Sequence, residues 1–271
     1  MLHVARWCMG LFAICIALSA HAQDVEAVKR AAEQGDASAQ YNLGAMYAEG
    51  RGVARNDAEA VKWIRKATEQ GNADAQFYLG VMYFYGRGVA KNDVEAVKWF
   101  RLAAEQGNAF GQNNLGLMYA MGRGVARNDA EAMKWYLKSA EQDNALALIN
   151  LGAMYLDGQG VARNDAEAVK WYRKAAELGN AFGQYNLVVM YADGRGVARN
   201  DAEAVEWYRL AAEQGYALAQ NNLGLMYLYG RGVAKNDAEA VKWLRKAAEQ
   251  GNKNAQAVLG AMKIKAPSTT Q

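Results

Sequence analysis

Residues 37–72 read ASAQYNLGAMYAEGRGVARNDAEAVKWIRKATEQGN, and the chain contains six in-phase copies of this stretch. Tryptophan marks the period, because Trp63 is followed by five further tryptophans, each 36 residues after the one before. The sixth copy, residues 217–252, reads ALAQNNLGLMYLYGRGVAKNDAEAVKWLRKAAEQGN. A fixed period of this kind indicates a solenoid, in which one small supersecondary unit stacks on the next.

The first half of each copy predicts an amphipathic helix. In the first copy Leu43, Met46 and Tyr47 recur at helical spacing and form one apolar stripe. Gly50 follows the stripe, at the position where a left-handed residue commonly ends a helix. Gly44 lies inside this helix despite a cost of about 1 kcal/mol relative to alanine, so we expect two helix backbones to approach closely there.

The second half predicts another helix, which begins after a short Gly-rich link. Asn56 is a favourable N-cap, and Glu59 three residues later resembles a capping box. Trp63 and Ile64 belong to the face expected to be buried, and Gly71 ends the helix. Two short helices cannot bury a tryptophan unaided, so neighbouring copies must pack against each other.

The sequence predicts five segments, which are a signal peptide, an N-terminal capping helix, the repeats, a C-terminal capping helix and a disordered tail. They span residues 1–22, 23–36, 37–252, 253–265 and 266–271 respectively. The N-terminal capping helix reads as the second half of a unit shortened by three residues, and the C-terminal one as a first half.

The first 22 residues are typical of a secretory signal. Arg6 precedes an uncharged apolar run, Cys8–Ala20, and Ala20-His21-Ala22 supplies a small-x-small cleavage site. The run is shorter than the roughly 20 residues that span a bilayer, which disfavours the alternative of a retained anchor. We therefore expect a periplasmic or secreted protein that begins at Gln23 and does not span the membrane.

Composition excludes much chemistry once the signal is removed. The two cysteines and two histidines all lie within residues 1–22, so thiol nucleophiles, histidine bases and Cys/His zinc sites are lost with it. No S-x-x-K motif is present. The formal net charge is only +3, which disfavours nucleic acid as a partner. We expect no catalysis, no metal and no cofactor.

The repeated LGxMY…GxGVxxNDxEAxxWYxxAAEQG pattern resembles the Sel1-like repeat family from residue 24 to about 262. The resemblance implies an all-α fold, a right-handed α/α superhelix of antiparallel helix pairs whose first helices line the concave surface. Exported bacterial members act in envelope assembly, sensing or host contact. A cysteine-rich branch is linked to β-lactamase activity, but this chain lacks that branch's cysteines. Three residues depart from the pattern: Val188 for the helix glycine, Asp143 for the stop glycine and Gln159 for the loop arginine.

Differences among the copies indicate where a partner would bind. Five positions of the first helix vary between copies while the Leu43 stripe does not, and they lie opposite that stripe at 100° per residue. Apolar, aromatic and asparagine side chains there suit a protein or peptide. Six residues are therefore the predicted partner-binding groove: Tyr41, Phe77, Tyr85, Asn113, Asn221 and Tyr229. The alternative is that adjacent first helices bury part of this face.

A second candidate is a basic rim formed by the links between the helices. Its arginines would lie beside the N-termini of the second helices, a place suited to anions such as envelope glycan: Arg51, Arg55, Arg87, Arg123, Arg195 and Arg231. Asp57 and Glu59 lie close by and should cancel much of the positive field. The sequence favours a non-catalytic protein-interaction scaffold of the cell envelope over a glycan- or anion-binding module, an enzyme or a spacer.

Overall fold

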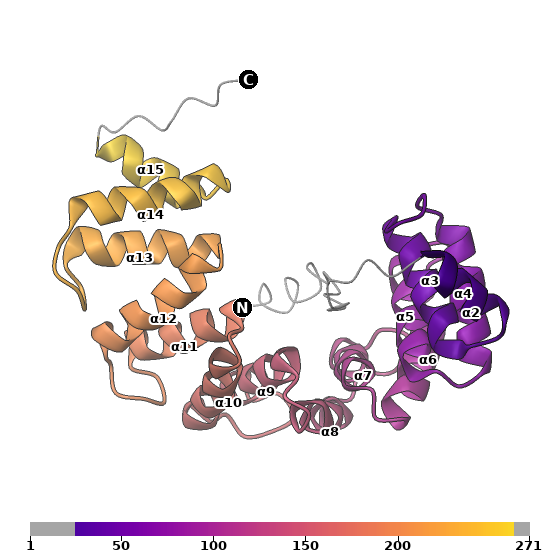
Figure 1. Ribbon diagram of the computed structural model, residues 1–271. Coiled ribbons are helices and arrows are strands. Elements are labelled where there is room, and N and C mark those ends of the chain that lie inside the picture. The colour runs from indigo at the N-terminus through magenta and orange to yellow at the C-terminus, as the bar shows by residue number, and fades with distance from the viewer. Residues whose placement is uncertain (1–24, 263–271) are drawn as a thin grey trace. The chain divides into compact units, whose positions relative to one another are not determined.

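A computed structural model describes residues 25–262 of the chain, and those residues contain fourteen helices and no strand (Figure 1). They divide into two compact units at the junction of Gln142 and Asp143. The predicted signal peptide and tail, together with residues 263–265 of the predicted capping helix, lie outside the described residues. Between residues 25 and 262 no helix has the length and apolar character needed to cross a bilayer.

Unit 1, residues 25–142, begins with a lone helix and continues with three helix pairs. The lone helix is α2 (Val25–Glu33). The pairs are α3 (Ala37–Glu49) with α4 (Asp57–Glu69), α5 (Ala73–Tyr85) with α6 (Asp93–Glu105), and α7 (Ala109–Met121) with α8 (Asp129–Ala140). Helix α2 packs against α3, α4 against α5 and α6 against α7, so the unit is a continuous stack.

Unit 2, residues 143–262, has three helix pairs followed by a lone helix. The pairs are α9 (Ala145–Asp157) with α10 (Asp165–Glu177), α11 (Ala181–Asp193) with α12 (Asp201–Glu213), and α13 (Ala217–Tyr229) with α14 (Asp237–Glu249). The lone helix is α15 (Lys253–Ala261), which packs on α14. The expected all-α stack of helix pairs is confirmed within each unit.

The helix ends follow the predicted capping chemistry. The Asn56 side chain accepts hydrogen bonds from the backbone N–H groups of Ala58 and Glu59, both at 3.1 Å. Gly50 ends α3 with φ 71°, a left-handed conformation that costs a glycine little. Asp143, which replaces the stop glycine, adopts the same region with φ 56°. The substitution therefore leaves the turn intact.

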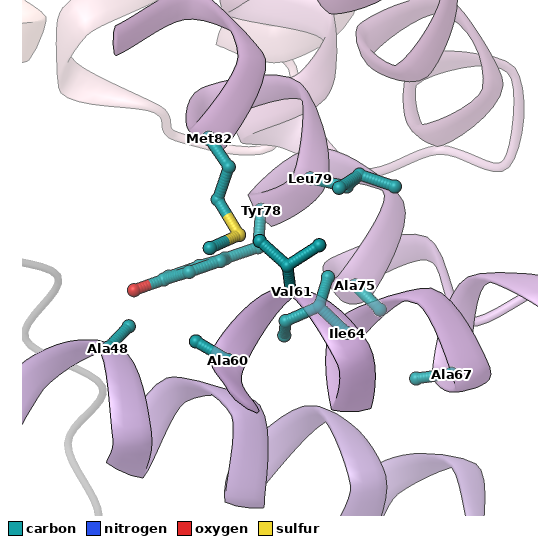
Figure 2. Close-up of a cluster of buried hydrophobic side chains, with 9 residues drawn as sticks. All are labelled: Ala48, Ala60, Val61, Ile64, Ala67, Ala75, Tyr78, Leu79 and Met82. Carbon is teal, nitrogen blue, oxygen red and sulfur yellow. The ribbon is translucent and has the colours of Figure 1, made fainter. Parts of the chain in front are cut away.

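The two helices of a pair approach each other closely at the glycine inside the first helix, which is Gly44 in the first repeat. A Cβ added to Gly44 would lie 2.7 Å from the Ile64 side chain and 3.1 Å from the Ala60 carbonyl oxygen. Figure 2 shows Ile64 among Ala60, Val61 and Leu79 in the core that α3, α4 and α5 share. The predicted close approach of two helices is confirmed, and this glycine is required for packing.

Each tryptophan lies between consecutive repeats. Trp63 packs with Leu43 and Ala39 of α3 and with Ala32 of α2. The Lys66 ammonium group lies 4.3 Å from the centroid of the indole ring, so a cation covers its outer edge. This tryptophan is a core residue, as its spacing predicts.

A glutamine pair, with one side chain buried and the other exposed, links the two helices of most repeats. The side chain of Gln70, at the end of α4, donates from Nε2 to Oε1 of Gln40 at 2.8 Å. The equivalent bond recurs in four other repeats, between Gln106 and Gln76, Gln142 and Gln112, Gln214 and Gln184, and Gln250 and Gln220. In the fourth repeat both positions are leucine, Leu148 and Leu178. The two positions thus change together, as a contacting pair should.

Helix α2 fits the 36-residue frame without the three-residue deletion that the sequence suggested. A Cβ added to Gly52 would lie 2.7 Å from Cγ2 of Val25, and one added to Gly88 would lie 2.8 Å from Cγ2 of Val61. Val25 therefore occupies the place of Val61, and the nine residues of α2 correspond one to one to the last nine residues of α4. Sequence alignment misses this because Ala27 stands where every full repeat has tryptophan.

Candidate interaction surface

Large apolar side chains are exposed on the first helices at two positions of the repeat. One is the second residue of the helix, occupied by Phe110 in unit 1 and Leu218 in unit 2. The other is the last residue, occupied by Tyr85 and Met121 in unit 1 and by Tyr229 in unit 2. We call Tyr85, Phe110 and Met121 the unit 1 surface, and Leu218 and Tyr229 the unit 2 surface.

Two of the six residues predicted to line a groove are exposed. Tyr85 is 45% and Tyr229 is 67% accessible to solvent. Tyr41 is half-buried, and its ring meets Tyr78 of the next first helix edge-on, with centroids 6.1 Å apart. Burial raises the pKa of the Tyr41 hydroxyl well above its ordinary value, so this side chain is a neutral packing group with limited access to a partner.

The expectation that Phe77, Asn113 and Asn221 face an open groove is wrong. Their accessible fractions are 5%, 3% and 4%, respectively. All three occupy the same position, the middle of the first helix. Neighbouring first helices approach each other there, and the side chain is enclosed between them. The alternative interpretation, packing between repeats, holds for this position.

In the second repeat, which belongs to unit 1, the enclosed side chain is the aromatic Phe77, and it supports exposed neighbours. The Phe77 ring packs against Phe110 at a centroid distance of 5.8 Å and against Phe100 at 6.0 Å. At the other end of α5, the rings of Phe84 and Tyr85 pack edge-on at 5.0 Å. The unit 1 surface therefore rests on buried rings, which hold Phe110 and Tyr85 in place.

In unit 2 the enclosed side chain belongs to a chain of hydrogen bonds. Asn254 donates from Nδ2 to Oδ1 of Asn221 at 3.1 Å, and Asn221 donates in turn to Asn222 at 2.8 Å. Asn222 donates to the hydroxyl oxygen of Tyr208 at 3.0 Å. Burial raises the pKa of Tyr208 to about 12, so its hydroxyl stays neutral. Asn221 is occupied by these bonds and does not offer its amide to a partner.

Tyr216 marks a second aromatic group in unit 2. It stands at the N-cap of α13, where the other repeats have a side chain that accepts a backbone hydrogen bond, and it makes no such bond. Its ring instead packs against Phe182 at 4.9 Å and against Tyr185 at 5.3 Å. At this N-cap, aromatic packing replaces the usual side-chain hydrogen bond. Positions that depart from such a local preference are candidates for function.

The first helices differ from the rest of the described chain in charge. Helices α3, α5, α7, α9, α11 and α13 contain no lysine or arginine. They carry four carboxylates, which are Glu49, Asp74, Asp157 and Asp193. The basic residues lie on the links and the second helices. The surface offered by the first helices is thus apolar with a negative tendency.

The arginines of the predicted basic rim are paired with carboxylates. Asp165 illustrates this, because Arg163 lies 3.1 Å from one of its oxygens and Arg195 lies 3.1 Å from the other. Hydrogen bonds from these two guanidinium groups lower the pKa of Asp165 to about 2. The same arrangement holds Asp57 between Arg55 and Arg87, and Asp201 between Arg199 and Arg231.

The remaining rim arginines are engaged as well. Arg123 makes a two-pronged contact with Asp93 at 2.7 and 3.0 Å and lies 4.2 Å from the centre of the Phe84 ring. Arg51 is 2.5 Å from a Glu49 oxygen. The rim is a ladder of ion pairs between consecutive repeats, and the anion-binding alternative gains no support from it.

The acidic residues at the starts of the second helices have structural partners. Glu59 contacts Lys62 at 3.1 Å, one turn along the helix, while Asp57 lies between the two arginines. Within residues 25–262 no three acidic, histidine or cysteine side chains gather in a way that would hold a metal ion. These carboxylates are therefore engaged in ion pairs within and between the repeats.

The sequence placed Phe110, Met121 and Leu218 at variable positions without selecting them for the groove. The available signal is their place in the helix, since the exposed large apolar side chains of the first helices all occupy its second or last residue. A choice of helix ends over helix middles would have found all three.

Comparison with known proteins agrees with this architecture. The family model described as Sel1 repeat matches six consecutive segments, residues 37–72, 73–108, 109–144, 145–180, 181–216 and 217–252. No protein with a curated description matches the chain in sequence.

Two solved structures share both sequence and fold with the chain. One is a protective antigen of uropathogenic Escherichia coli with an SLR fold, which is 40% identical with a TM-score of 0.79. That match covers 88% of this chain but 51% of the antigen, so the chain spans about half the length of that protein. The other is a Sel1 repeat protein from Oxalobacter formigenes, 36% identical with a TM-score of 0.75, over 82% of this chain and 90% of that one.

A third structure is similar in fold alone. The immunity protein PA5088 from Pseudomonas aeruginosa is 22% identical with a TM-score of 0.55, and the match covers 80% of this chain and 82% of that chain. Six matched repeats and two similar structures with at least 36% identity leave one conclusion: the chain belongs to the Sel1 repeat family.

Proposed function

We propose that this protein is a non-catalytic scaffold of the cell envelope that binds other proteins through the exposed ends of its first helices. Proteins of the Sel1 repeat family are generally protein–protein interaction scaffolds. The observation that supports this proposal is the gathering of exposed apolar side chains at just two positions of the first helix. Exposed rings and aliphatic groups held by buried rings are suited to act as anchors in an interface.

The charge of the first helices specifies the partner further. Because these helices carry carboxylates and no basic residue, an acidic segment finds no ion-pair partner on the helices themselves. The partner is expected to present apolar or aromatic side chains and to carry basic groups at the margin of the contact. The proposed place in the envelope rests on the signal-like residues 1–22.

Site-specific photo-crosslinking tests the surface directly. A photoreactive amino acid is placed at Tyr85 or Phe110, and in matched control proteins at Val94 or Leu102, which are exposed on the second helix α6. The proposal expects one protein to be captured from the first-helix positions and not from the α6 positions. Equal capture from both sets would overturn it, because contact would then not depend on the first helices.

Substitutions on the unit 1 surface measure how much it contributes to binding of the captured protein. Changing Tyr85 and Met121 to aspartate adds charge to exposed positions, so the fold is retained while binding of the captured protein weakens. A Phe77→Asp substitution is unsuited to this purpose, because Phe77 is buried and its loss would unfold the unit. Calorimetry measures the affinity of each variant for the captured protein. The control Val94→Asp should bind it as tightly as the original chain.

A further inference from the structure

The two ends of the described chain are complementary halves of one repeat. Among residues 25–262, α2 is a second helix for which no first helix of its own pair is described, and α15 is a first helix for which no second helix is described. In the 36-residue frame Val28 of α2 occupies the place of Ile64, while Gly260 of α15 occupies the place of Gly44. Ile64 and Gly44 are the residues that meet where a helix pair closes.

Gly260 has no packing role among the described residues. At Gly44, Gly80, Gly116, Gly152 and Gly224 an added Cβ would lie within 2.9 Å of the partner helix. At Gly260 nothing lies within 4 Å. A glycine inside a helix is about fivefold less favourable than alanine in local helix equilibrium, so an open Gly260 is a cost that packing within residues 25–262 does not explain.

The glutamine pair of the repeat is also divided between the two ends. Gln256 occupies the place of Gln40 and donates to the Ala248 carbonyl oxygen at 3.1 Å, as Gln40 does to Ala32. Gln34 occupies the place of Gln70, the donor to Gln40. Both side chains are exposed, and neither finds its glutamine partner among residues 25–262. The fourth repeat shows that when this pair is dropped, both of its members change.

The charged residues at the two ends bear on the same contact between α2 and α15. Lys253 is the first residue of α15, where every full repeat has alanine. A cation there opposes the positive end of its own helix dipole. At the equivalent position in unit 1, the Ala109 carbonyl oxygen accepts a hydrogen bond from Ser139 near the end of α8, so this position faces the last turn of a second helix. In α2 that turn ends with Glu33 at the negative end of the dipole, and it also carries the basic residue Arg30.

We propose that copies of this protein associate head to tail, with α2 of one copy docking on α15 of another to complete the divided repeat. In this contact Val28 of one copy packs against Gly260 of the other. Gln34 then donates a hydrogen bond to Gln256, and Glu33 lies beside Lys253. Such a contact joins two different surfaces, so it leaves both outer ends free and adds copies in line. The partner is a second copy of this chain, because the two faces match each other residue by residue.

Sedimentation velocity of the full chain over a wide concentration range tests the association. The expected result is a sedimentation coefficient that rises with concentration and a Gly260→Val variant that remains monomeric. Because no atom lies within 4 Å of the added Cβ, this variant keeps its fold. The control Ala238→Val, which copies the exposed Val94 of the second repeat, should associate like the original chain. A chain that stays monomeric at millimolar concentration overturns the proposal, as it would if residues outside 25–262 covered α2 or α15.

Two further variants identify the faces. Gln256→Leu should weaken association, since Gln34 then loses its hydrogen-bond partner at the contact, and adding Gln34→Leu should restore it by copying Leu148 and Leu178. Lys253→Glu should also weaken association, whereas Lys91→Glu, the same charge change in an exposed link, should not.

Mixing distinguishes this contact from a symmetric one. Ala27→Lys blocks the α2 face at an exposed position, and Gly260→Val blocks the α15 face. Each variant alone should be monomeric, while an equimolar mixture should form dimers and nothing larger. Dimers formed by either variant alone would contradict the head-to-tail arrangement. The separate proposal about the first-helix surfaces does not depend on this result.

Discussion

The fifth residue of the first helix is enclosed in both the second and the sixth repeat, but these two repeats fill the position with different chemistry. In unit 1 Phe77 packs its ring against Phe100 and Phe110. In unit 2 Asn221, at the same position of the repeat, is held by hydrogen bonds with Asn222 and Asn254. The comparison shows that burial at this position is set by the neighbouring helices, because an aromatic ring and an amide are covered equally well.

The largest expected effect is the loss of the ring in unit 1. Phe77→Ala leaves a cavity between α5, α6 and α7, and a cost of about 3–5 kcal/mol in the free energy of unfolding is expected. Urea denaturation followed by circular dichroism measures it. A cost below about 1 kcal/mol would mean that Phe77 is not enclosed as described.

The equivalent change in unit 2 should cost less. Asn221→Ala removes little volume but leaves the amides of Asn254 and Asn222 without their partner, for a loss of about 1–3 kcal/mol. The same denaturation experiment applies. If Asn221→Ala lowered the free energy of unfolding more than Phe77→Ala, the hydrogen bonds of Asn221 would contribute more to stability than the packing of the Phe77 ring.

The ion-pair ladder gives a pH-dependent prediction of smaller size. The pKa of Asp165 is lowered from 3.8 to about 2, so its contribution to stability is present above pH 3.8 and is lost as the pH falls toward 2. Arg195→Gln removes one of its two arginines and should raise this pKa. The cost at neutral pH should stay below about 1 kcal/mol, since the pair is close to solvent.

NMR titration of the Asp165 carboxyl carbon measures that change. The matched variant Arg163→Gln removes the other arginine and should shift the pKa in the same direction. An unchanged titration in both variants would show that the carboxylate is not held by the ladder.

The smallest effects on stability belong to the exposed surfaces. Tyr85→Ala and Tyr229→Ala remove side chains that stand in solvent, so each should change the free energy of unfolding by no more than about 0.5 kcal/mol. Thermal denaturation checks this. A large destabilisation by either would place that tyrosine in the packing of its unit and remove it from the proposed surface.

Much of the fold was predictable because each helix carries its own signals. Asn56 caps a helix, Gly50 ends one, and Gly44 marks a close approach, all through local backbone chemistry. The candidate surface was less predictable. Tyr85 and Phe77 look alike in sequence, but one is exposed and the other buried, because only one lies where adjacent first helices meet.

The sequence by itself determined the period, the helix pairs and the family, since these depend on residue type and spacing within 36 residues. Only the tertiary structure decided which variable side chains reach solvent, which arginines are neutralised by aspartates, and that α2 continues the frame of the repeats. These properties depend on contacts between residues that are 18 to 36 positions apart in the chain, such as the bond from Arg65 to Tyr83 or from Gln70 to Gln40. Periodicity places such residues on a helix face, but the packing of that face decides what each one touches.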